Sequence, residues 1–364
     1  MNSSRFPFLT VVCCSIIIGT LLLGCSDDDN PASSKQYVWA PLGTGVDDYV
    51  SDLTVYDNML IASCSFAGGG RTAAWDGSSW ATLGTGFDYG VFSLTVFDSK
   101  LIAGGRFTTA GGVNASAIAA WDGSSWAPLG TGLVFTTDVA RAMTLTTFGN
   151  KLIAGGFFDM AGGVSAGRIA AWDGLSWAPL GAGMTYSGTS PSVDALTIYG
   201  NQLVAGGWFN TAGGVTANNI AAWNGSSWAP LGTGMDVGVS CFTIYDSTLI
   251  AGGKFTTAGG VSANHIAAWD GSSWTPLGTG LDGNVSALCV YENRLIAGGY
   301  FATAGGVSAN CIAAWNGSSW TALGSGTDIG ISSLTVYNNK LIAGGSFTTA
   351  GGVSANNIAA WGPK

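Results

Sequence analysis

The amino-acid sequence predicts an all-β fold, and three observations support this prediction. A Trp-Asp-Gly-Ser-Ser-Trp phrase and its variants occur seven times, and successive copies are 46 or 51 residues apart. Glycine makes up 58 of 364 residues, as many tight turns require, and only 9% of residues are charged. Short strands repeated every 40 to 50 residues or so are typical of a β-propeller. The first tryptophans of the copies are Trp75, Trp121, Trp172, Trp223, Trp269, Trp315 and Trp361.

Each copy is expected to form one blade of four antiparallel strands. In the second copy the pattern predicts strands over 93–98, 100–107, 117–121 and 126–130. Short polar turns join the first strand to the second and the third to the fourth. The two longer connections of a four-stranded meander emerge on one face, which we call the long-loop face. Binding residues of such scaffolds are usually carried by loops, so we expect a site on this face.

The ends of the repeat region predict how the domain closes. Residues 38–43 read as a fourth strand without a blade of its own, and the last copy ends on a third strand at Trp361. We therefore expect a seven-bladed β-propeller of four-stranded blades over 37–364, closed by an N-terminal outer strand that completes the last blade. Such closure leaves no open sheet edge, which favours a monomer.

Three landmarks of each copy resemble those of kelch-type repeats. They are Leu-Ile-Ala-Gly-Gly on the second strand, Trp-Asp at the end of the third and Trp-x-x-Leu on the fourth. The resemblance covers 39–361 and implies a propeller, with no particular activity. The chain departs from the kelch pattern where Trp replaces Tyr and where Ser63 and Cys64 replace Gly-Gly. The near-identical copies also look like those of bacterial extracellular repeat proteins, which implies a location outside the cytoplasm.

The first 24 residues predict a secretory signal. Arg5 precedes an apolar run that ends in Leu-Leu-Gly before Cys25. This end resembles the bacterial lipobox, which implies cleavage before Cys25 and its lipidation; an uncleaved membrane anchor of about 19 residues is the alternative. Residues 25–36 then read as a lipidated cysteine followed by an acidic, polar tether. Its run of three aspartates resembles export signals of surface lipoproteins, so we expect a lipid-anchored protein at the bacterial outer membrane or cell surface, held to the membrane through Cys25.

Charge and composition disfavour several classes of function. Loss of Arg5 with the signal changes the formal net charge from −9 to −10, and an acidic chain is a poor partner for nucleic acid. Glu292 and His265 are the only residues of their types, so we expect no metal and no other cofactor. Four cysteines are expected to be free thiols that pack as small apolar side chains. They are Cys64, Cys241, Cys289 and Cys311.

Variation between the copies indicates candidate ligand-binding residues. The phenylalanine after the second strand never changes, yet the residue before it varies; these pre-Phe positions are Ser65, Arg106, Phe157, Trp208, Lys254, Tyr300 and Ser346. A second variable position precedes the third strand, at Arg71, Ala117, Arg168, Asn219, His265, Cys311 and Asn357. Both sets are expected toward the long-loop face. The alternative is drift at tolerant contacts between blades.

Arginine and aromatic residues gather in one sector of this set. The expected ligand-binding residues are Arg71, Arg106, Arg141, Arg168, Phe157, Trp208, Tyr186, Lys254 and Tyr300. Guanidinium groups bind carboxylates, and flat aromatic faces stack on sugars or peptides. This predicts a glycan or protein ligand with negative charge. The alternative is that each arginine pairs with a nearby aspartate.

No residue is assigned a catalytic role. The stretch 163–167 matches a Gly-x-Ser-x-Gly nucleophile motif, but it is the repeat phrase with one substitution. We therefore expect a non-enzymatic binding module, with a polysaccharide lyase or hydrolase as the alternative. A ring of aspartates in the connectors either caps turns or holds a cation. These are Asp47, Asp88, Asp236, Asp282 and Asp328.

Overall fold

The structure, a computed structural model, describes residues 35–66, 69–188 and 190–364. The predicted signal segment, Cys25 and most of the tether lie outside these residues. By its contacts the chain divides into Met1–Gln36 and Tyr37–Lys364, and the second unit is described below. Every regular element in the described residues is a β-strand. The described part of the chain contains no helix that is long and apolar enough to span a bilayer.

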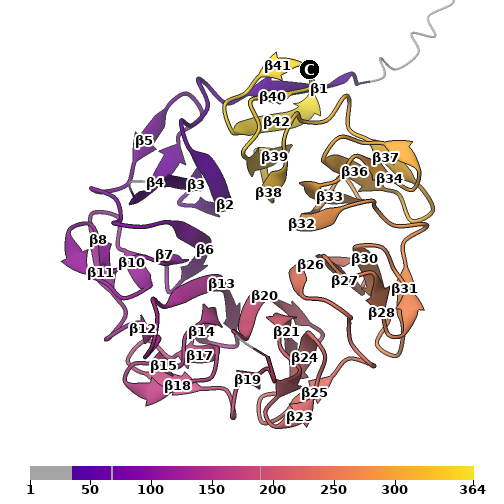
Figure 1. Cartoon of the computed structure of the whole chain (residues 1–364). Coiled ribbons are helices and arrows are strands. Elements are labelled where there is room, and N and C mark those ends of the chain that lie inside the picture. Colours follow the sequence, from indigo (N-terminus) through magenta and orange to yellow (C-terminus); the bar gives the residue numbers. More distant parts are fainter. Residues whose placement is uncertain (1–34, 67–68, 189) are drawn as a thin grey trace, which may run out of the picture. The chain divides into compact units, whose positions relative to one another are not determined.

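Seven four-stranded antiparallel sheets are present among the described residues (Figure 1). Sheet 1 consists of β2 (Tyr49–Tyr56), β3 (Met59–Phe66), β4 (Gly69–Trp75) and β5 (Trp80–Thr82), and sheet 2 of β6 (Val91–Phe97), β7 (Lys100–Gly105), β10 (Ile118–Trp121) and β11 (Trp126–Pro128). Sheet 3 consists of β13 (Arg141–Phe148), β14 (Lys151–Phe157), β17 (Ile169–Trp172) and β18 (Trp177–Pro179), and sheet 4 of β20 (Ser192–Tyr199), β21 (Gln202–Trp208), β24 (Ile220–Trp223) and β25 (Trp228–Pro230). Sheet 5 consists of β26 (Val239–Tyr245), β27 (Thr248–Gly253), β30 (Ile266–Trp269) and β31 (Trp274–Pro276), and sheet 6 of β32 (Asn284–Tyr291), β33 (Arg294–Tyr300), β36 (Ile312–Trp315) and β37 (Trp320–Ala322). Sheet 7 consists of β38 (Ile331–Tyr337), β39 (Lys340–Gly345), β42 (Ile358–Pro363) and β1 (Tyr37–Pro41).

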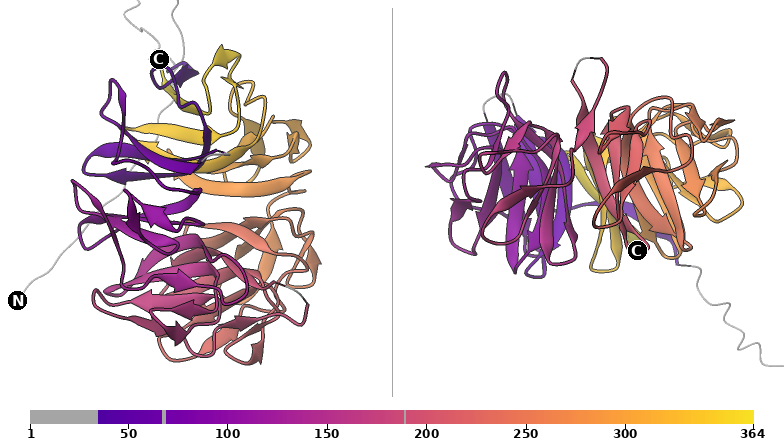
Figure 2. Two further views of the ribbon diagram at one scale, coloured as in Figure 1. Left: turned by 60° about the vertical axis from the view of Figure 1, so that its left-hand side comes forward. Right: turned by 90° about the horizontal axis from the view of Figure 1, so that it is seen from below.

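The sheets lie side by side around a common centre (Figure 1). The first strand of each sheet contacts the first strand of the next, and β38 of sheet 7 also contacts β2 of sheet 1. In the right-hand view of Figure 2 the strands run across the thickness of this arrangement. The N-terminal strand β1 pairs antiparallel with the C-terminal strand β42, so that Trp39 lies opposite Trp361.

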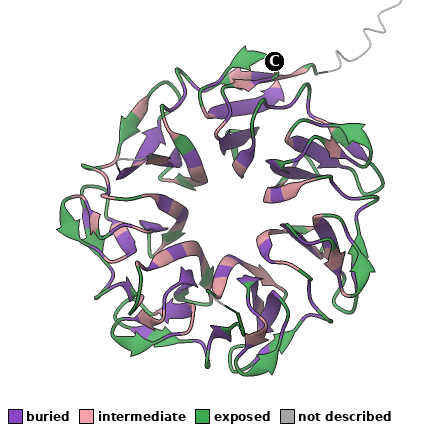
Figure 3. Cartoon of the chain, viewed as in Figure 1, coloured by how far each residue is buried: buried purple, intermediate pink, exposed green. Residues whose placement is uncertain are grey.

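The second strand of each sheet is buried on both faces, because sheets cover it from either side. In sheet 2, Leu101, Ile102 and Ala103 are at most 1% exposed, which explains the unbroken apolar run in the sequence. Glycine follows because the neighbouring sheet leaves no room: a Cβ on Gly104 would lie 2.8 Å from the Cβ of Ala142 in sheet 3. Figure 3 shows burial along the inner and middle strands and exposure at the outer edge.

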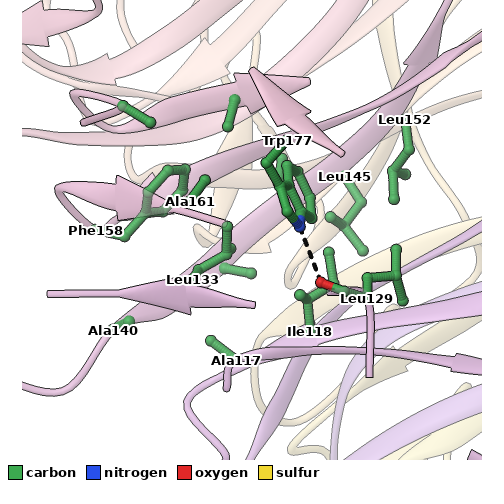
Figure 4. Packing of buried hydrophobic residues seen from close by; sticks show 14 of the residues in the cluster. Ala117, Ile118, Leu129, Leu133, Ala140, Leu145, Leu152, Phe158, Ala161 and Trp177 are labelled. Carbon is green, nitrogen blue, oxygen red and sulfur yellow. Dashed lines mark hydrogen bonds between the residues drawn. The ribbon is translucent and has the colours of Figure 1, made fainter. Parts of the chain in front are cut away.

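The tryptophan of each outer strand forms a hydrogen bond to the preceding sheet. In Figure 4 the indole Nε1 of Trp177 donates to the main-chain oxygen of Leu129, at 2.9 Å, within an apolar cluster between sheets 2 and 3. The same bond joins Trp39 to Leu323, Trp80 to Leu42, Trp126 to Leu83, Trp228 to Leu180, Trp274 to Leu231 and Trp320 to Leu277. The repeated Trp-x-x-Leu pattern is therefore a structural link between sheets.

In sheets 2 to 7 the connections from second to third strands contain small hairpins, where the sequence predicts loops. Their strands are β8 (Thr109–Ala110), β9 (Val113–Asn114), β15 (Met160–Ala161), β16 (Val164–Ser165), β22 (Thr211–Ala212), β23 (Val215–Thr216), β28 (Thr257–Ala258), β29 (Val261–Ser262), β34 (Thr303–Ala304), β35 (Val307–Ser308), β40 (Thr349–Ala350) and β41 (Val353–Ser354). Glycine pairs form the turns because both residues need a positive φ: Gly111 has 59° and Gly112 has 82°. The two longer connectors each add a third strand, β12 (Leu133–Val134) and β19 (Met184–Thr185).

Candidate functional site

The aspartate of the repeated Trp-Asp-Gly-Ser-Ser-Trp phrase is part of a turn. The carboxylate of Asp122 accepts hydrogen bonds from the main-chain N–H groups of Ser124 and Ser125, both at 2.8 Å. Hydrogen bonds from Ser125 and Ser124 lower the pKa of Asp122 to about 2. The most frequent motif of the chain therefore belongs to the scaffold.

Four of the five predicted connector aspartates hold their connector against a hairpin. Asp88 accepts hydrogen bonds from the main-chain N–H of Thr108 at 2.8 Å and of Thr109 at 2.9 Å. Asp236, Asp282 and Asp328 bind the hairpins of their own sheets in the same way. Within the described residues no three or more His, Cys, Asp or Glu side chains are grouped so that they could hold a metal ion. These four contacts are of the capping kind.

Two of the predicted aromatic residues lie open on the surface at pre-Phe positions. Trp208, at the end of β21, is 42% exposed, and Tyr300, at the end of β33, is 48% exposed. Each ring packs over the glycine that enters the following sheet, Gly238 or Gly330, where a Cβ would clash with the ring. The aromatic faces are thus held flat and still open to solvent. Lys254, the pre-Phe residue between them, binds Gly238 through its main-chain N–H.

Phe157 was expected to offer an aromatic surface, and the structure corrects this expectation. The side chain is only 8% exposed and stacks on Phe135 with ring centroids 4.2 Å apart. The guanidinium groups of Arg141 and Arg168 lie 5.1 and 5.3 Å from its centroid. Phe135 belongs to the longer connector into sheet 3, so the inserted residues cover Phe157.

The predicted arginines have partners inside the protein. Arg71 forms an ion pair with Asp48, and Arg141 lies 3.6 Å from the carboxylate of Asp138. Arg168 donates to the main-chain oxygens of Phe158 and Pro191 at 2.7 and 2.9 Å. Burial lowers the pKa of Arg168, so this guanidinium is partly withdrawn from water. The pairing alternative therefore describes Arg71 and Arg141.

The remaining two predicted residues differ in their surroundings. The guanidinium carbon of Arg106 lies 5.5 Å from the ring centroid of Tyr89, a tyrosine that is 52% exposed. Tyr186 is 39% exposed and packs over Gly188 of its own connector. Tyr89 and Tyr186 therefore add exposed aromatic surface on two different connectors.

Sequence reasoning missed Asp194, which lies on β20 beside the end of β21. Asp194 is the extra residue of a bulge between Val193 and Ala195, in the strand that pairs Ser192 with Trp208. Burial raises the pKa of Asp194 to about 6, against a hydrogen bond from Ser192 and the charge of Lys254. The signal was in the repeats, because four of the other copies carry serine at this bulge: Ser51, Ser240, Ser286 and Ser332.

A pocket of about 570 Å³ opens beside Tyr300, between sheet 6 and the connector into sheet 7. Its wall includes Ile329, which is 45% exposed, and the partly buried thiol of Cys311. All four cysteines of the described residues are free, as predicted. Burial raises the pKa of Cys311 and raises that of Cys64 to about 12, so neither thiol is activated.

Comparisons with known proteins agree with the fold. A family model described as "Domain of unknown function (DUF5122) beta-propeller" matches residues 338–359, and no curated protein matches the chain. The WD40 repeats of RRP9 are 13% identical with a TM-score of 0.57, and the match covers 90% of this chain and 97% of that one. The computationally designed protein Ika8 is also 13% identical, with a TM-score of 0.52 and coverage of 88% and 98%.

A third similar structure comes from a bacterium. It is an extracellular domain assigned to a hybrid two-component system of B. thetaiotaomicron, 10% identical with a TM-score of 0.57. The match covers 88% of this chain and 39% of that one. These identities show the fold alone. The prediction of an all-β propeller built from repeats is confirmed.

Proposed function

We propose that the chain is a lipid-anchored, kelch-like propeller of seven blades that binds a glycan at the bacterial outer membrane or cell surface without turning it over. The observation that carries the binding proposal is the pair Trp208 and Tyr300, two exposed aromatic faces held flat over glycine at the same position of two copies. Flat, rigid aromatic surface at low entropic cost is what a sugar ring needs for stacking. A protein ligand is the competing outcome of the test below.

Two hydrogen bonds support the closed seven-bladed ring. The indole of Trp39 on β1 donates to Leu323 of sheet 6, as the outer-strand tryptophan of every other sheet does to the sheet before it. The hydroxyl of Tyr337, on β38, donates to the main-chain oxygen of Asn58 in sheet 1 at 3.1 Å. With β1 as its outer strand, sheet 7 then closes the circle between sheets 6 and 1.

The anchor is proposed from the sequence at 1–36. Fatty-acid labelling of the expressed protein should be lost in Cys25→Ala. Ser26, which this variant keeps, has no thiol to accept the lipid. Labelling that persists in Cys25→Ala would contradict a lipid on this cysteine.

The binding proposal is tested on an array of neutral and acidic polysaccharides. Full-length protein should bind a polysaccharide without releasing shorter products. The double variant Trp208→Ala/Tyr300→Ala should bind about thirtyfold less tightly, since two stacking contacts of roughly 1 kcal/mol each are removed. Val113→Ala, an exposed hairpin residue, is the matched control with unchanged binding. Binding to proteins only, or equal binding by the double variant, would contradict the proposal.

One observation favours a polysaccharide-active enzyme as the second candidate. Asp194, whose pKa is about 6, lies beside Trp208, and an acid with a pKa near neutrality can donate a proton to a leaving group. Release of shorter saccharides by the wild-type protein, lost in Asp194→Asn while binding persists, would establish the enzyme and displace the binding module. Binding with no release in either protein excludes it.

A further inference from the structure

The pocket beside Tyr300 is formed where the sixth copy departs from the repeat. In the seventh copy the corresponding residues are Ser346, Thr348 and Asn357; in the sixth they are Tyr300, Ala302 and Cys311. These three are the differences between the two copies from the pre-Phe position to the third strand, and all three line the pocket.

The connector into sheet 7 adds a fourth departure to the same pocket. The residue before its conserved aspartate is Thr327, where the neighbouring connectors carry the apolar side chains of Met235 and Leu281. Thr327 turns its hydroxyl to the main-chain oxygen of Ile329, at 2.9 Å. The polar replacement shapes the connector that forms one wall of the pocket.

Two of these changes replace side chains that make internal contacts in some of the other copies. Asn219 and Asn357 donate from Nδ2 to the main-chain oxygens of Met235 and Val46, at 2.9 and 2.8 Å. A thiol at the same position, Cys311, is shorter and has no amide to make this bond; it contacts the side chain of Thr327, the residue equivalent to Met235 and Val46.

The carboxylate of Asp282, at the other side of the pocket, has a different set of partners, with a side-chain hydrogen bond from Thr303. The Thr348 hydroxyl hydrogen-bonds to Asp328, and Thr256 and Thr108 do the same for Asp236 and Asp88. Ala302 has no hydroxyl and offers Asp282 only its main-chain N–H, at 2.9 Å. The sixth copy thus carries shorter side chains than the seventh at two of the positions that line the pocket.

We propose that this pocket binds an uncharged pyranose sugar, with its ring on Tyr300 and its hydroxyls on the carboxylates of Asp282 and Asp328. The volume of about 570 Å³ is within the range of ligand pockets, about 300 to 1,000 Å³. The described side chains that line it include two carboxylates and an amide but no Lys or Arg. A carboxylate accepts sugar hydroxyls and repels an acidic sugar. The inference rests on the glycan-binding function proposed above and assigns its sugar class and location.

Between the pre-Phe position and the third strand, the test replaces the three residues in which the sixth copy differs from the seventh. Tyr300→Ser/Ala302→Thr/Cys311→Asn gives the sixth copy the residues of the seventh, so the variant has the scaffold contacts of a copy that already folds. Saturation-transfer NMR on full-length protein would use the methyl glycosides of glucose, galactose and mannose, with glucuronic acid as the charged probe. We expect saturation transfer from the wild-type protein to a neutral glycoside, at least tenfold weaker binding by the triple variant, and no comparable binding of glucuronic acid. His265→Asn makes the same change one sheet away and should bind as wild type.

The outcomes separate this inference from the broader function. Equal binding of the neutral glycoside by the triple variant, or preferred binding of glucuronic acid, overturns the pocket assignment. If Trp208→Ala weakens polysaccharide binding while the triple variant does not, the pocket is wrong and glycan binding stands. If wild type binds no saccharide in either assay, both fail. Thermal unfolding of the triple variant at the wild-type temperature shows that any loss of binding is local.

Discussion

At the scale of single residues, the buried carboxylate of Asp52 on β2 makes an unusual contact between sheets. Its carboxylate accepts hydrogen bonds from the main-chain N–H of Leu94 at 2.8 Å, from that of Leu53 at 2.9 Å and from the Ser333 hydroxyl at 2.9 Å. One side chain therefore joins sheets 7, 1 and 2. Burial raises the pKa of Asp52 to about 6, although these hydrogen bonds oppose the rise. An acid with a raised pKa favours the fold while it is protonated, and this contribution is lost as the pH rises through about 6.

Asp52→Ser should therefore raise the unfolding temperature at pH 8. The unfolding temperature of this variant should also fall less than that of wild type between pH 5 and pH 8. Serine at the equivalent positions already makes the link between sheets: Ser93 accepts from the Leu145 N–H and Ser333 from the Leu53 N–H, both at 3.1 Å. A pKa shift of this size, from 3.8 to about 6, corresponds to about 3 kcal/mol. Thermal unfolding across pH 4 to 9 measures the effect. An unchanged pH profile in Asp52→Ser would contradict the assigned pKa.

Phe157 and Trp208 occupy the same position of the repeat and should differ in stability effect. Phe157→Ala removes a ring that is 8% exposed and should cost about 3 kcal/mol. Trp208→Ala removes a ring that is 42% exposed and should cost roughly 1 kcal/mol or less. Urea unfolding of both variants compares them directly. Equal losses would mean that Trp208 is also a core residue and has no free face for a ligand.

Sequence alone predicted the exposed side chain of Trp208 and failed on Phe157 for a physical reason. The position in the repeat determines where the side chain leaves the backbone, but the exposure of that side chain depends on which residues pack over it. The longer connector into sheet 3 brings Phe135 onto Phe157, and no spacing rule shows where an inserted residue will pack. The pairing of Arg71 with Asp48 is likewise a contact between a connector and a strand far apart in the sequence.

At the scale of elements, four-stranded sheets could be predicted because each copy alternates short apolar runs with turn residues. In the second copy β6 begins at Val91, two residues before the predicted start, because the strand continues through a bulge between Val91 and Ser93. The hairpins β8–β9 and their equivalents were predicted as loops. Strands of two residues are too short to show an alternating pattern, and only the positive φ values at the Gly-Gly pairs make the turn possible.

The tryptophan link between outer strands makes a prediction at this scale. Trp320→Phe keeps an aromatic ring but removes the Nε1–H that donates to Leu277 at 3.0 Å. A buried carbonyl without its donor should cost about 1 to 3 kcal/mol. Chemical unfolding measures the loss, with Trp320→Leu expected to cost more because it also removes ring packing. A Phe variant as stable as wild type would show that the bond to Leu277 contributes nothing.

At the scale of the whole molecule, the two ends of the repeat region depend on each other. Five residue pairs from Tyr37 with Pro363 to Pro41 with Ala359 join β1 to β42. Trp39 is 6% exposed and packs against Trp361 with ring centroids 5.4 Å apart. The outer strand of sheet 7 is thus supplied from the opposite end of the chain, as the lone strand at 38–43 led us to expect.

Deletion of residues 36–42 should lower the free energy of unfolding by several kcal/mol, because a whole strand and the buried Trp39 are lost. Deletion of seven residues before them, 28–34, serves as the control and should leave the unfolding temperature unchanged. Differential scanning calorimetry compares the two. A melting temperature that survives the loss of 36–42 would show that the ring closes without β1.

The most direct test of the account is a crystal structure of the protein with the neutral methyl glycoside that gives the strongest saturation transfer. We predict one sugar ring stacked on Tyr300, between sheet 6 and the connector into sheet 7, with hydroxyls on Asp282 and Asp328. A sugar bound instead among Arg71, Arg106 and Arg168, or on the outer strands, would contradict the account.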